Sequence, residues 1–285
     1  MKRFFDAIIG SNLYISAAAL LLAIQTQIQL TGTARWHPYL FLIFFATLFE
    51  YNVHRLTTII FFPQALESPK HQWVRGNRHL FRIVVVISVL GFCATLFEAK
   101  TEVLIALAPF AVLTVFYSMP VSKTARKLFR LREIPYLKIF LIAIVWSAVT
   151  VLLPVMYETQ TFSSTGIRLM LLERFLFVLA ITIPFDIRDM DTDQEGRLRT
   201  IPLTLGKASS VKLAITIMIA FTVISMIHYS TVEQWNLVSA FFVSGLTTMY
   251  FVGSKRLQSS PWYHYGILDG TMIVQALLVL LLNTL

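Results

Sequence analysis

The chain has few charged residues and little that would stabilise a soluble or secreted fold. Only 14% of its 285 residues are charged, only fifteen are acidic, and the single cysteine, Cys93, excludes a disulfide framework. Hydrophobic residues make up 56% of the chain, and the mean hydropathy is +0.70. These values lie well outside the range of soluble globular domains. The sequence therefore predicts an integral membrane protein.

The chain also lacks the features of a modular or nucleic-acid-binding protein. No long repeat, low-complexity tract or Gly/Ser-rich linker is present, so we expect a single domain over 1–285. The formal net charge is +9, but the cations are gathered in the segments between apolar runs. Orientation in a membrane explains that distribution better than binding to nucleic acid does. We therefore expect a lipid bilayer as the surrounding partner and no nucleic acid.

Nine apolar runs are long enough to cross about 30 Å of hydrocarbon as helices. They predict an all-α, polytopic membrane protein with nine transmembrane helices. Lys2 and Arg3 precede the first run, which has the character of a retained span rather than a cleaved signal peptide. The expected spans are 11–30, 39–61, 81–97, 103–119, 136–155, 167–185, 211–230, 235–252 and 265–282.

The basic residues outside the spans alternate sharply between the two sides of the membrane. Nineteen of the 24 Lys and Arg residues fall on the side of the N-terminus, four fall on the other side, and Arg55 lies within a span. Loops rich in Lys and Arg stay in the cytoplasm. We therefore expect a cytoplasmic N-terminus and an external C-terminus, in a membrane of the bacterial inner-membrane type.

One polar stretch, 184–200, stands out from the apolar chain. Five of the fifteen acids fall within ten residues of it. Asp186, Asp189 and Asp193 are spaced i, i+3, i+7 and would share one face of a helix. Like charges so close together repel unless a cation lies among them, and hard oxygen ligands suit Mg2+. With Arg188 nearby, this is the composition of a site for a metal-bound, diphosphate-type anion. The alternative is a solvated loop between two membrane helices.

The second expected span carries four polar or ionisable residues. Such groups are costly in hydrocarbon and face a bundle interior or a wet cavity. They form either an internally satisfied cluster, such as an ion pair between Glu50 and Arg55, or one wall of a cavity shared with the acidic stretch. The four residues are Glu50, Asn52, His54 and Arg55.

The segment after the fourth expected span is unusually basic. Six cations fall between Lys123 and Lys138, which is more than membrane orientation needs. They either anchor this segment to anionic lipid or bind an anionic substrate.

Two motifs resemble those of a known family. Asp186-x-x-Asp189-x-x-x-Asp193, followed by Gly196 and by Arg199-Thr-Ile-Pro202, resembles the second Asp-rich motif of the UbiA superfamily of intramembrane prenyltransferases. The segment Tyr117-Ser-x-Pro120-x-x-Lys123 is similar to the family loop that meets the prenyl diphosphate. Helix number and motif order extend the resemblance over nearly the whole chain.

This resemblance implies a helical bundle around a central cavity, in which two Asp-rich motifs hold Mg2+ on a polyprenyl diphosphate. The diphosphate leaves, an allylic carbocation develops, and a lipophilic or aromatic acceptor attacks it in a water-excluded pocket. Asp186, Asp189 and Asp193 are then the expected catalytic and metal-binding residues. The residues expected to bind the diphosphate are Asn52, Arg55, Tyr117, Lys123, Arg130 and Arg188.

The chain departs from the family at the first Asp-rich motif, Asn-Asp-x-x-Asp-x-x-x-Asp. Asn52 is present, but the three acidic positions are Val53, Leu56 and Ile60. Three functions stay open at this point. The chain is a prenyltransferase that uses one metal-binding motif, with cations such as Arg55 carrying part of the diphosphate charge; or it is an altered, inactive relative with a binding or accessory role; or it is a transporter, since charged residues within membrane helices also occur there.

Overall fold

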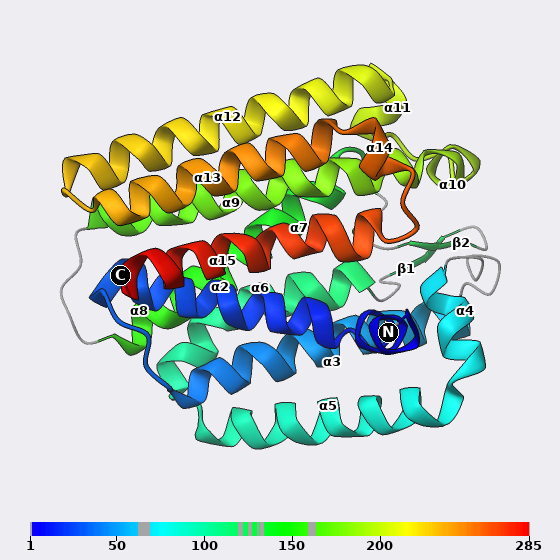
Figure 1. The fold of residues 1–285 in the computed structure, drawn as a ribbon. Coiled ribbons are helices and arrows are strands. Elements are labelled where there is room, and N and C mark those ends of the chain that lie inside the picture. Colours follow the sequence, from blue (N-terminus) through cyan, green and yellow to red (C-terminus); the bar gives the residue numbers. More distant parts are fainter. Residues whose placement is uncertain are drawn as a thin grey trace.

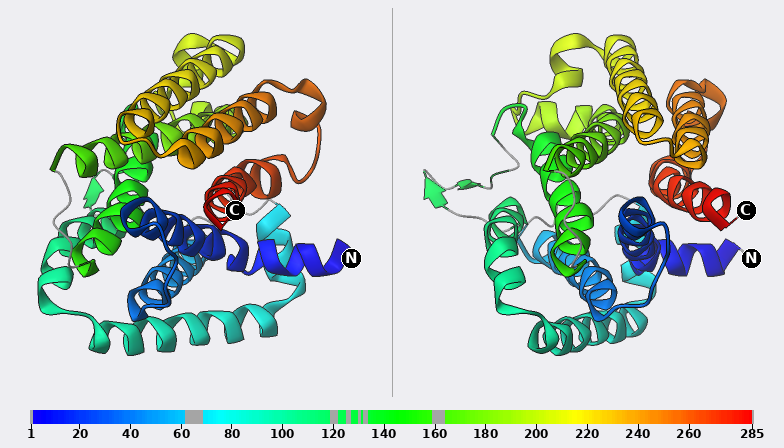
Figure 2. Two further views of the ribbon diagram at one scale, coloured as in Figure 1. Left: turned by 60° about the vertical axis from the view of Figure 1, so that its left-hand side comes forward. Right: turned by 90° about the vertical axis from the view of Figure 1, so that its left-hand side faces the viewer.

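The computed structural model describes the backbone of residues 2–61, 69–118, 122–124, 127–129, 131, 134–158 and 164–284. Over these residues the protein is helical apart from one short antiparallel ribbon, and its long helices run side by side (Figure 1). Viewed along their axes, the long helices form a ring (Figure 2). The prediction of an all-α membrane fold is confirmed.

The long helical segments follow the apolar runs closely. Two of them contain a π-helical turn, named η3 and η4, which continues directly into an α-helix. The segments are α2 (Leu13–Thr31), α3 (Pro38–Phe61), α5 (Arg78–Glu98), α6 (Thr101–Ser118), α7–η3–α8 (Leu137–Ser147, Ala148–Leu152, Leu153–Tyr157), α9 (Ser164–Arg188), α12 (Lys207–Thr231), α13 (Trp235–Gly253) and η4–α15 (Tyr263–Leu268, Asp269–Thr284).

The short elements gather at one end of the ring, on the right in Figure 1. They join the long helices there, and two of them carry candidate residues, Lys123 on β1 and Asp193 on α10. They are α1 (Lys2–Gly10), α4 (Pro69–Gly76), β1 (Ser122–Thr124), β2 (Lys127–Phe129), α10 (Met190–Glu195), α11 (Ile201–Leu205) and α14 (Lys255–Gln258). The N-terminus lies toward this polar end and the C-terminus toward the other (Figure 1).

Six of the described helical segments are long and apolar enough to cross a membrane by length and composition. They are α2, α5, α7–η3–α8, α12, α13 and η4–α15. Helix α6 has an apolar stretch of only 17 residues, Thr101–Tyr117, while α3 and α9 carry charged side chains within their length. The fold thus gives an integral, multi-pass membrane protein, and the count of nine crossings stays a prediction.

The order of neighbours shows how the ring closes. Helix α9 packs against α12, α12 against α13, α13 against α15, α15 against α2, and α2 against α3. Helices α6 and α7 complete the circuit from α3 back to α9, and α5 covers α3 from outside. Helix α5 buries only Phe81, Val84 and Ser88, so the rest of its apolar surface is available to lipid. The ring sets the end of α9 beside the start of α7, where the acidic motif lies.

Candidate functional site

The three aspartates of the acidic motif are held at a break between two helices. The sequence predicts one continuous helical face, but α9 ends at Arg188 and α10 begins at Met190. The backbone stays nearly helical through the break, because Asp189 N–H donates to the Phe185 carbonyl at 3.0 Å and Asp193 N–H donates to the Asp189 carbonyl at 2.8 Å. The three carboxylates therefore still lie on one side. Asp186 and Asp193 are each only 3% exposed.

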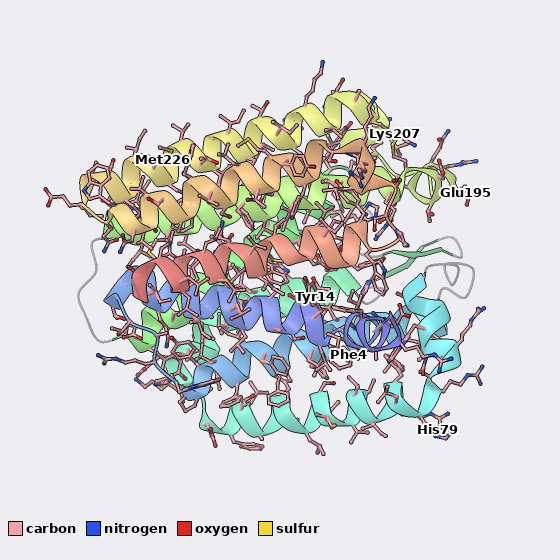
Figure 3. All side chains as sticks on the ribbon, in the orientation of Figure 1. Phe4, Tyr14, His79, Glu195, Lys207 and Met226 are labelled. Carbon is pink, nitrogen blue, oxygen red and sulfur yellow. The ribbon has the colours of Figure 1, made fainter. Side chains whose placement is uncertain are left out.

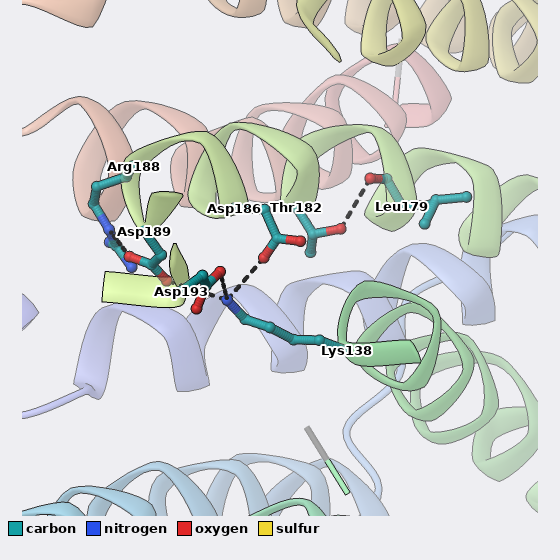
Figure 4. Close-up of polar contacts among 7 residues, drawn as sticks. All are labelled: Lys138, Leu179, Thr182, Asp186, Arg188, Asp189 and Asp193. Carbon is teal, nitrogen blue, oxygen red and sulfur yellow. Dashed lines mark hydrogen bonds and ion pairs between the residues drawn. The ribbon is translucent and has the colours of Figure 1, made fainter. Parts of the chain in front are cut away.

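The side chain at the centre of this site is Lys138, in the first turn of α7 (Figure 4). Its Nζ atom lies 2.8 Å from Asp186 Oδ1, 3.2 Å from Asp189 Oδ2 and 3.8 Å from Asp193 Oδ2. Lys138 is itself buried. A buried ammonium among three carboxylates offsets the repulsion that would otherwise separate them or protonate one of them.

The start of α7 is fixed to the segment that follows the acidic motif. Tyr136 has a left-handed backbone, with φ of 61°, and its N–H donates to the Arg199 carbonyl at 2.9 Å. The Tyr136 hydroxyl lies 3.1 Å from the Thr204 hydroxyl. These bonds place Lys138 one turn into the bundle, level with the carboxylates. Lys138 was expected only as one of several loop cations; its position inside the first turn of a very apolar span was the available signal.

Arg188 forms the other charged contact of the motif. Its Nε atom donates to Asp189 Oδ1 at 2.8 Å, and its guanidinium lies over the rings of Phe185, at 5.2 Å, and Tyr265, at 4.9 Å. Burial of the Asp189 carboxyl favours its neutral form, but attraction to Lys138 and Arg188 outweighs burial and lowers the pKa of Asp189 to about 2. Asp189 is therefore ionised throughout the physiological range.

The two candidate residues of α3 serve the junction between α1 and α2. Arg55 donates through Nη1 to the Gly10 carbonyl and through Nη2 to Asn12 Oδ1, the latter at 2.7 Å. Asn52 is fully buried; it accepts from Asn12 Nδ2 at 3.1 Å and donates to the Ser11 carbonyl at 3.3 Å. These contacts are structural, and a role for either side chain in binding a diphosphate stays a prediction.

The remaining candidate residues lie around the Tyr-x-x-Pro segment. Tyr117, at the end of α6, is half-buried, and its ring centre lies 6.1 Å from that of His54 on α3. Lys123 lies on β1, of which the structure describes the backbone only, and Arg130 lies outside the described residues. The expected approach of Lys123 and Arg130 to the acidic motif therefore stays a prediction.

Two further residues near the motif come from the last helical segment, in which sequence analysis found no motif. Tyr265 lies in the π-helical turn η4, where its ring lies under the Arg188 guanidinium and 6.1 Å from the ring of Phe185, centre to centre. Asp269, the first residue of α15, is buried. Tyr265 thus connects the last helical segment to the acidic motif.

A second buried polar cluster lies far from the acidic motif, in the first half of α9. Glu173 pairs with His228 Nδ1 at 2.7 Å and accepts from the Tyr229 hydroxyl at 3.1 Å. The neighbouring Arg174 donates to the Leu22 carbonyl at 3.3 Å. These adjacent charges are thus held by α12 and α2, respectively. The bonds tie three helices together inside the bundle.

The acidic motif fits Mg2+ only in part. Its three carboxylates supply the hard oxygen donors that Mg2+ prefers, and they converge on one point, where Lys138 now lies. Across the described residues, however, no group of three or more Asp, Glu, His or Cys side chains is arranged to hold a metal ion unaided. The arrangement suits a metal that takes one or two carboxylates and obtains its other ligands from phosphate and water.

Fold and site together define a polytopic helical membrane protein with a buried acidic site at one end of its bundle. The sequence model of the UbiA prenyltransferase family matches residues 75–261. The chain belongs to the UbiA prenyltransferase family.

Solved structures show the same fold at low sequence identity. A UbiA homologue from Archaeoglobus fulgidus, bound to GPP and Mg2+, is 11% identical and superposes with a TM-score of 0.64 over 98% of this chain and 100% of its own. A UbiA homologue from the same organism, bound to DMAPP and Mg2+, is 11% identical and has a TM-score of 0.63 over 98% of this chain and 99% of its own. A digeranylgeranylglyceryl phosphate synthase is 12% identical, with a TM-score of 0.58 over 100% and 98%. Comparison with curated proteins found no match.

Proposed function

We propose that the protein is a membrane prenyltransferase, which moves a polyprenyl group from its diphosphate to a lipophilic or aromatic acceptor with the help of Mg2+. The observation that carries the proposal is the buried convergence of three motif carboxylates on the Lys138 ammonium. Family membership and solved homologues that bind GPP or DMAPP with Mg2+ support it.

In this proposal the carboxylates of Asp186, Asp189 and Asp193 hold the metal–diphosphate complex. When bound, Mg2+ supplies positive charge that stabilises the departing diphosphate. Lys138 and Arg188 add donors on the same side: the ammonium can exchange one carboxylate for a phosphate oxygen, and the guanidinium is oriented by its stacking on Phe185 and Tyr265. The Arg188 guanidinium is thus oriented before the substrate arrives. Lys138, by contrast, has to leave the point between the carboxylates when the metal binds there.

The chemical step follows from that placement. The bond between the allylic carbon and the diphosphate oxygen breaks, and both electrons leave with the diphosphate. The allylic cation then forms a bond to the acceptor, which loses a proton. The chain's contribution is to hold the leaving group at the polar end of the bundle and to keep water from the cation.

The altered first motif limits how much metal the site can hold. Val53, Leu56 and Ile60 supply no oxygen ligand, and the Arg55 guanidinium is already bonded to the Gly10 carbonyl and Asn12. We therefore propose that the negative charge of the leaving diphosphate is neutralised mainly by one Mg2+, Lys138 and Arg188. Contributions from Asn52, Arg55, Tyr117, Lys123 and Arg130 require those side chains to reach the diphosphate from the opposite wall.

The same alteration supports a second candidate, a relative that binds prenyl diphosphates without transferring them. One experiment separates the two. The purified protein is incubated with radiolabelled prenyl diphosphates and with phenolic or glycerol phosphate acceptors, with and without Mg2+. Prenylated product that depends on Mg2+ and is lost in Asp186→Asn, but not in the exposed control Asp191→Asn, supports the transferase. Bound diphosphate without product supports the binding role. If neither bound diphosphate nor product is detected, both candidate functions are refuted.

A further inference from the structure

The N-terminal helix α1 differs in direction from the bundle. Figure 1 views it nearly end-on while α2 lies in the plane of the page, and Figure 2 shows it along its length, crossing the axes of the long helices. With nine residues it is about 13 Å long, far too short to cross hydrocarbon of about 30 Å. It therefore lies at the polar end of the bundle, beside the ends of the spanning helices.

The two ends of α1 have opposite environments. Near its start, Phe4 (Figure 3) is 65% exposed, Phe5 is 52% exposed, and Arg3 is exposed beside them. At its end, Ile9 and Gly10 are buried. Two adjacent exposed phenylalanines next to an exposed arginine would be costly in water but suit the boundary between headgroups and acyl chains.

The buried end of α1 rests on α4. A Cβ atom at Gly10 would overlap the ring of Trp73, so only glycine permits this close approach. The chain then turns sharply through Asn12, whose φ is 67°, and enters α2. Arg55 fixes the turn through the Gly10 carbonyl and Asn12, as described above. The direction of α1 is thus set by buried contacts with two other helices.

The surface around α1 is basic. Arg75 on α4, together with Arg78 and Arg82 on α5, is exposed like Arg3, and α4 packs against both α1 and α5. We call Arg3, Arg75, Arg78 and Arg82 the basic rim. Cations near a bilayer surface gain free energy only where the lipid headgroups are anionic, and salt screens that gain. Four exposed arginines on α1 and on the neighbouring helices α4 and α5, together with two exposed phenylalanines on α1, therefore match an anionic lipid surface.

We propose that α1 is an interfacial anchor, which inserts Phe4 and Phe5 among the acyl chains and places the basic rim on anionic headgroups. Arg55 and Asn52 are the side chains that hold it in this position, from the stretch of α3 where the family has its first acidic motif. The partner is the surface of the surrounding bilayer, and the inference does not depend on prenyl transfer.

The test places a fluorophore at the tip of the anchor. Phe5→Cys in a Cys93→Ser background is labelled with the environment-sensitive dye NBD, and the protein is reconstituted into nanodiscs of phosphatidylcholine alone or mixed with phosphatidylglycerol. We expect blue-shifted emission and quenching by brominated lipid, both stronger with phosphatidylglycerol and weaker at high salt. Arg3→Gln should lower the equilibrium ratio of membrane-inserted to detached α1 about fivefold, because one cation at an anionic surface contributes about that factor to binding.

A matched pair of glycine substitutions tests whether packing on α4 positions α1. Gly10→Ala should displace α1 from Trp73 and reduce lipid quenching, whereas Gly76→Ala, where a Cβ meets nothing within 4 Å, should leave it unchanged. The proposal is overturned if the dye is quenched by aqueous iodide rather than by lipid, or if insertion is the same in both lipid mixtures at all salt concentrations. Equal lipid quenching in Gly10→Ala and Gly76→Ala would refute the claim that the contact of Gly10 with Trp73 positions α1 on α4.

Discussion

Replacing Lys138 by methionine tests the electrostatic centre of the site. The substitution keeps the length and most of the volume of the side chain but removes the ammonium from among Asp186, Asp189 and Asp193. Removing one partner of a buried charge cluster costs about 3–5 kcal/mol. The pKa of Asp189 gives a second estimate of this free energy. Its fall from 3.8 to about 2 corresponds to roughly 2 kcal/mol of stabilisation of the ionised carboxyl, to which Lys138 and Arg188 both contribute.

The pH dependence identifies the cause of the loss. Because the folded state lowers the pKa of Asp189, the associated stability is present above pH 3.8 and is lost as the pH falls toward 2. In Lys138→Met the Asp189 carboxylate loses the nearby ammonium that lowers its pKa, so its pKa rises and the folded variant takes up protons more readily. The destabilisation should therefore be largest at neutral pH and should shrink at pH 5.

Thermal unfolding in detergent at pH 7 and pH 5 measures this directly. We expect a fall in Tm of roughly 5–10 °C at pH 7 and a clearly smaller fall at pH 5. Lys212→Met, on an exposed position of α12, is the matched control and should change Tm little. Adding Asp186→Asn to Lys138→Met should restore part of the loss. An equal loss at both pH values, or a loss no larger than that of Lys212→Met, would refute the electrostatic account.

Three further predictions concern the fold. A reporter fused after residue 285 should be active only outside the cytoplasm, and cytoplasmic activity would contradict the expected topology. Gly245→Ala should lower Tm by several degrees, because the added Cβ would overlap the Thr222 hydroxyl between α13 and α12; an unchanged Tm would show that the helices separate freely there. Glu173→Gln should cost about 1–3 kcal/mol by weakening the buried contact with His228, and a neutral effect on thermal unfolding would contradict its role in tying α9 to α12.

Hydropathy predicted the long helices well because a helix needs a run of about 20 apolar residues to cross the hydrocarbon core of a bilayer. It missed α1, which is too short to cross and is set by contacts distant in sequence, such as Gly10 with Trp73. The π-helical turn before Asp269 was not predicted from the sequence either.

The site was predictable where it is local in sequence and not where it is formed by packing. The spacing of Asp186, Asp189 and Asp193 predicted that their carboxylates lie together, because residues three or four apart share a helix face. The prediction holds across the break at Asp189 because the backbone there stays nearly helical. The cation among them comes from α7, some 50 residues earlier, and no spacing rule connects the two. The binding of Arg55 to a diphosphate stays a prediction, and the sequence did not reveal the helix junction on which its partners Gly10 and Asn12 lie.

The central claim is that the motif carboxylates bind metal and prenyl diphosphate together, and calorimetry tests it most directly. Titration of Mg2+ into the protein should show weak binding alone and much tighter binding when a prenyl diphosphate is present, since phosphate supplies ligands that one or two carboxylates cannot. Asp186→Ala and Asp193→Ala should abolish this joint binding, while Asp191→Ala, on the exposed side of α10, should retain it. Tight Mg2+ binding without diphosphate, or joint binding that survives in Asp186→Ala and Asp193→Ala, would contradict the assignment of these carboxylates as the site.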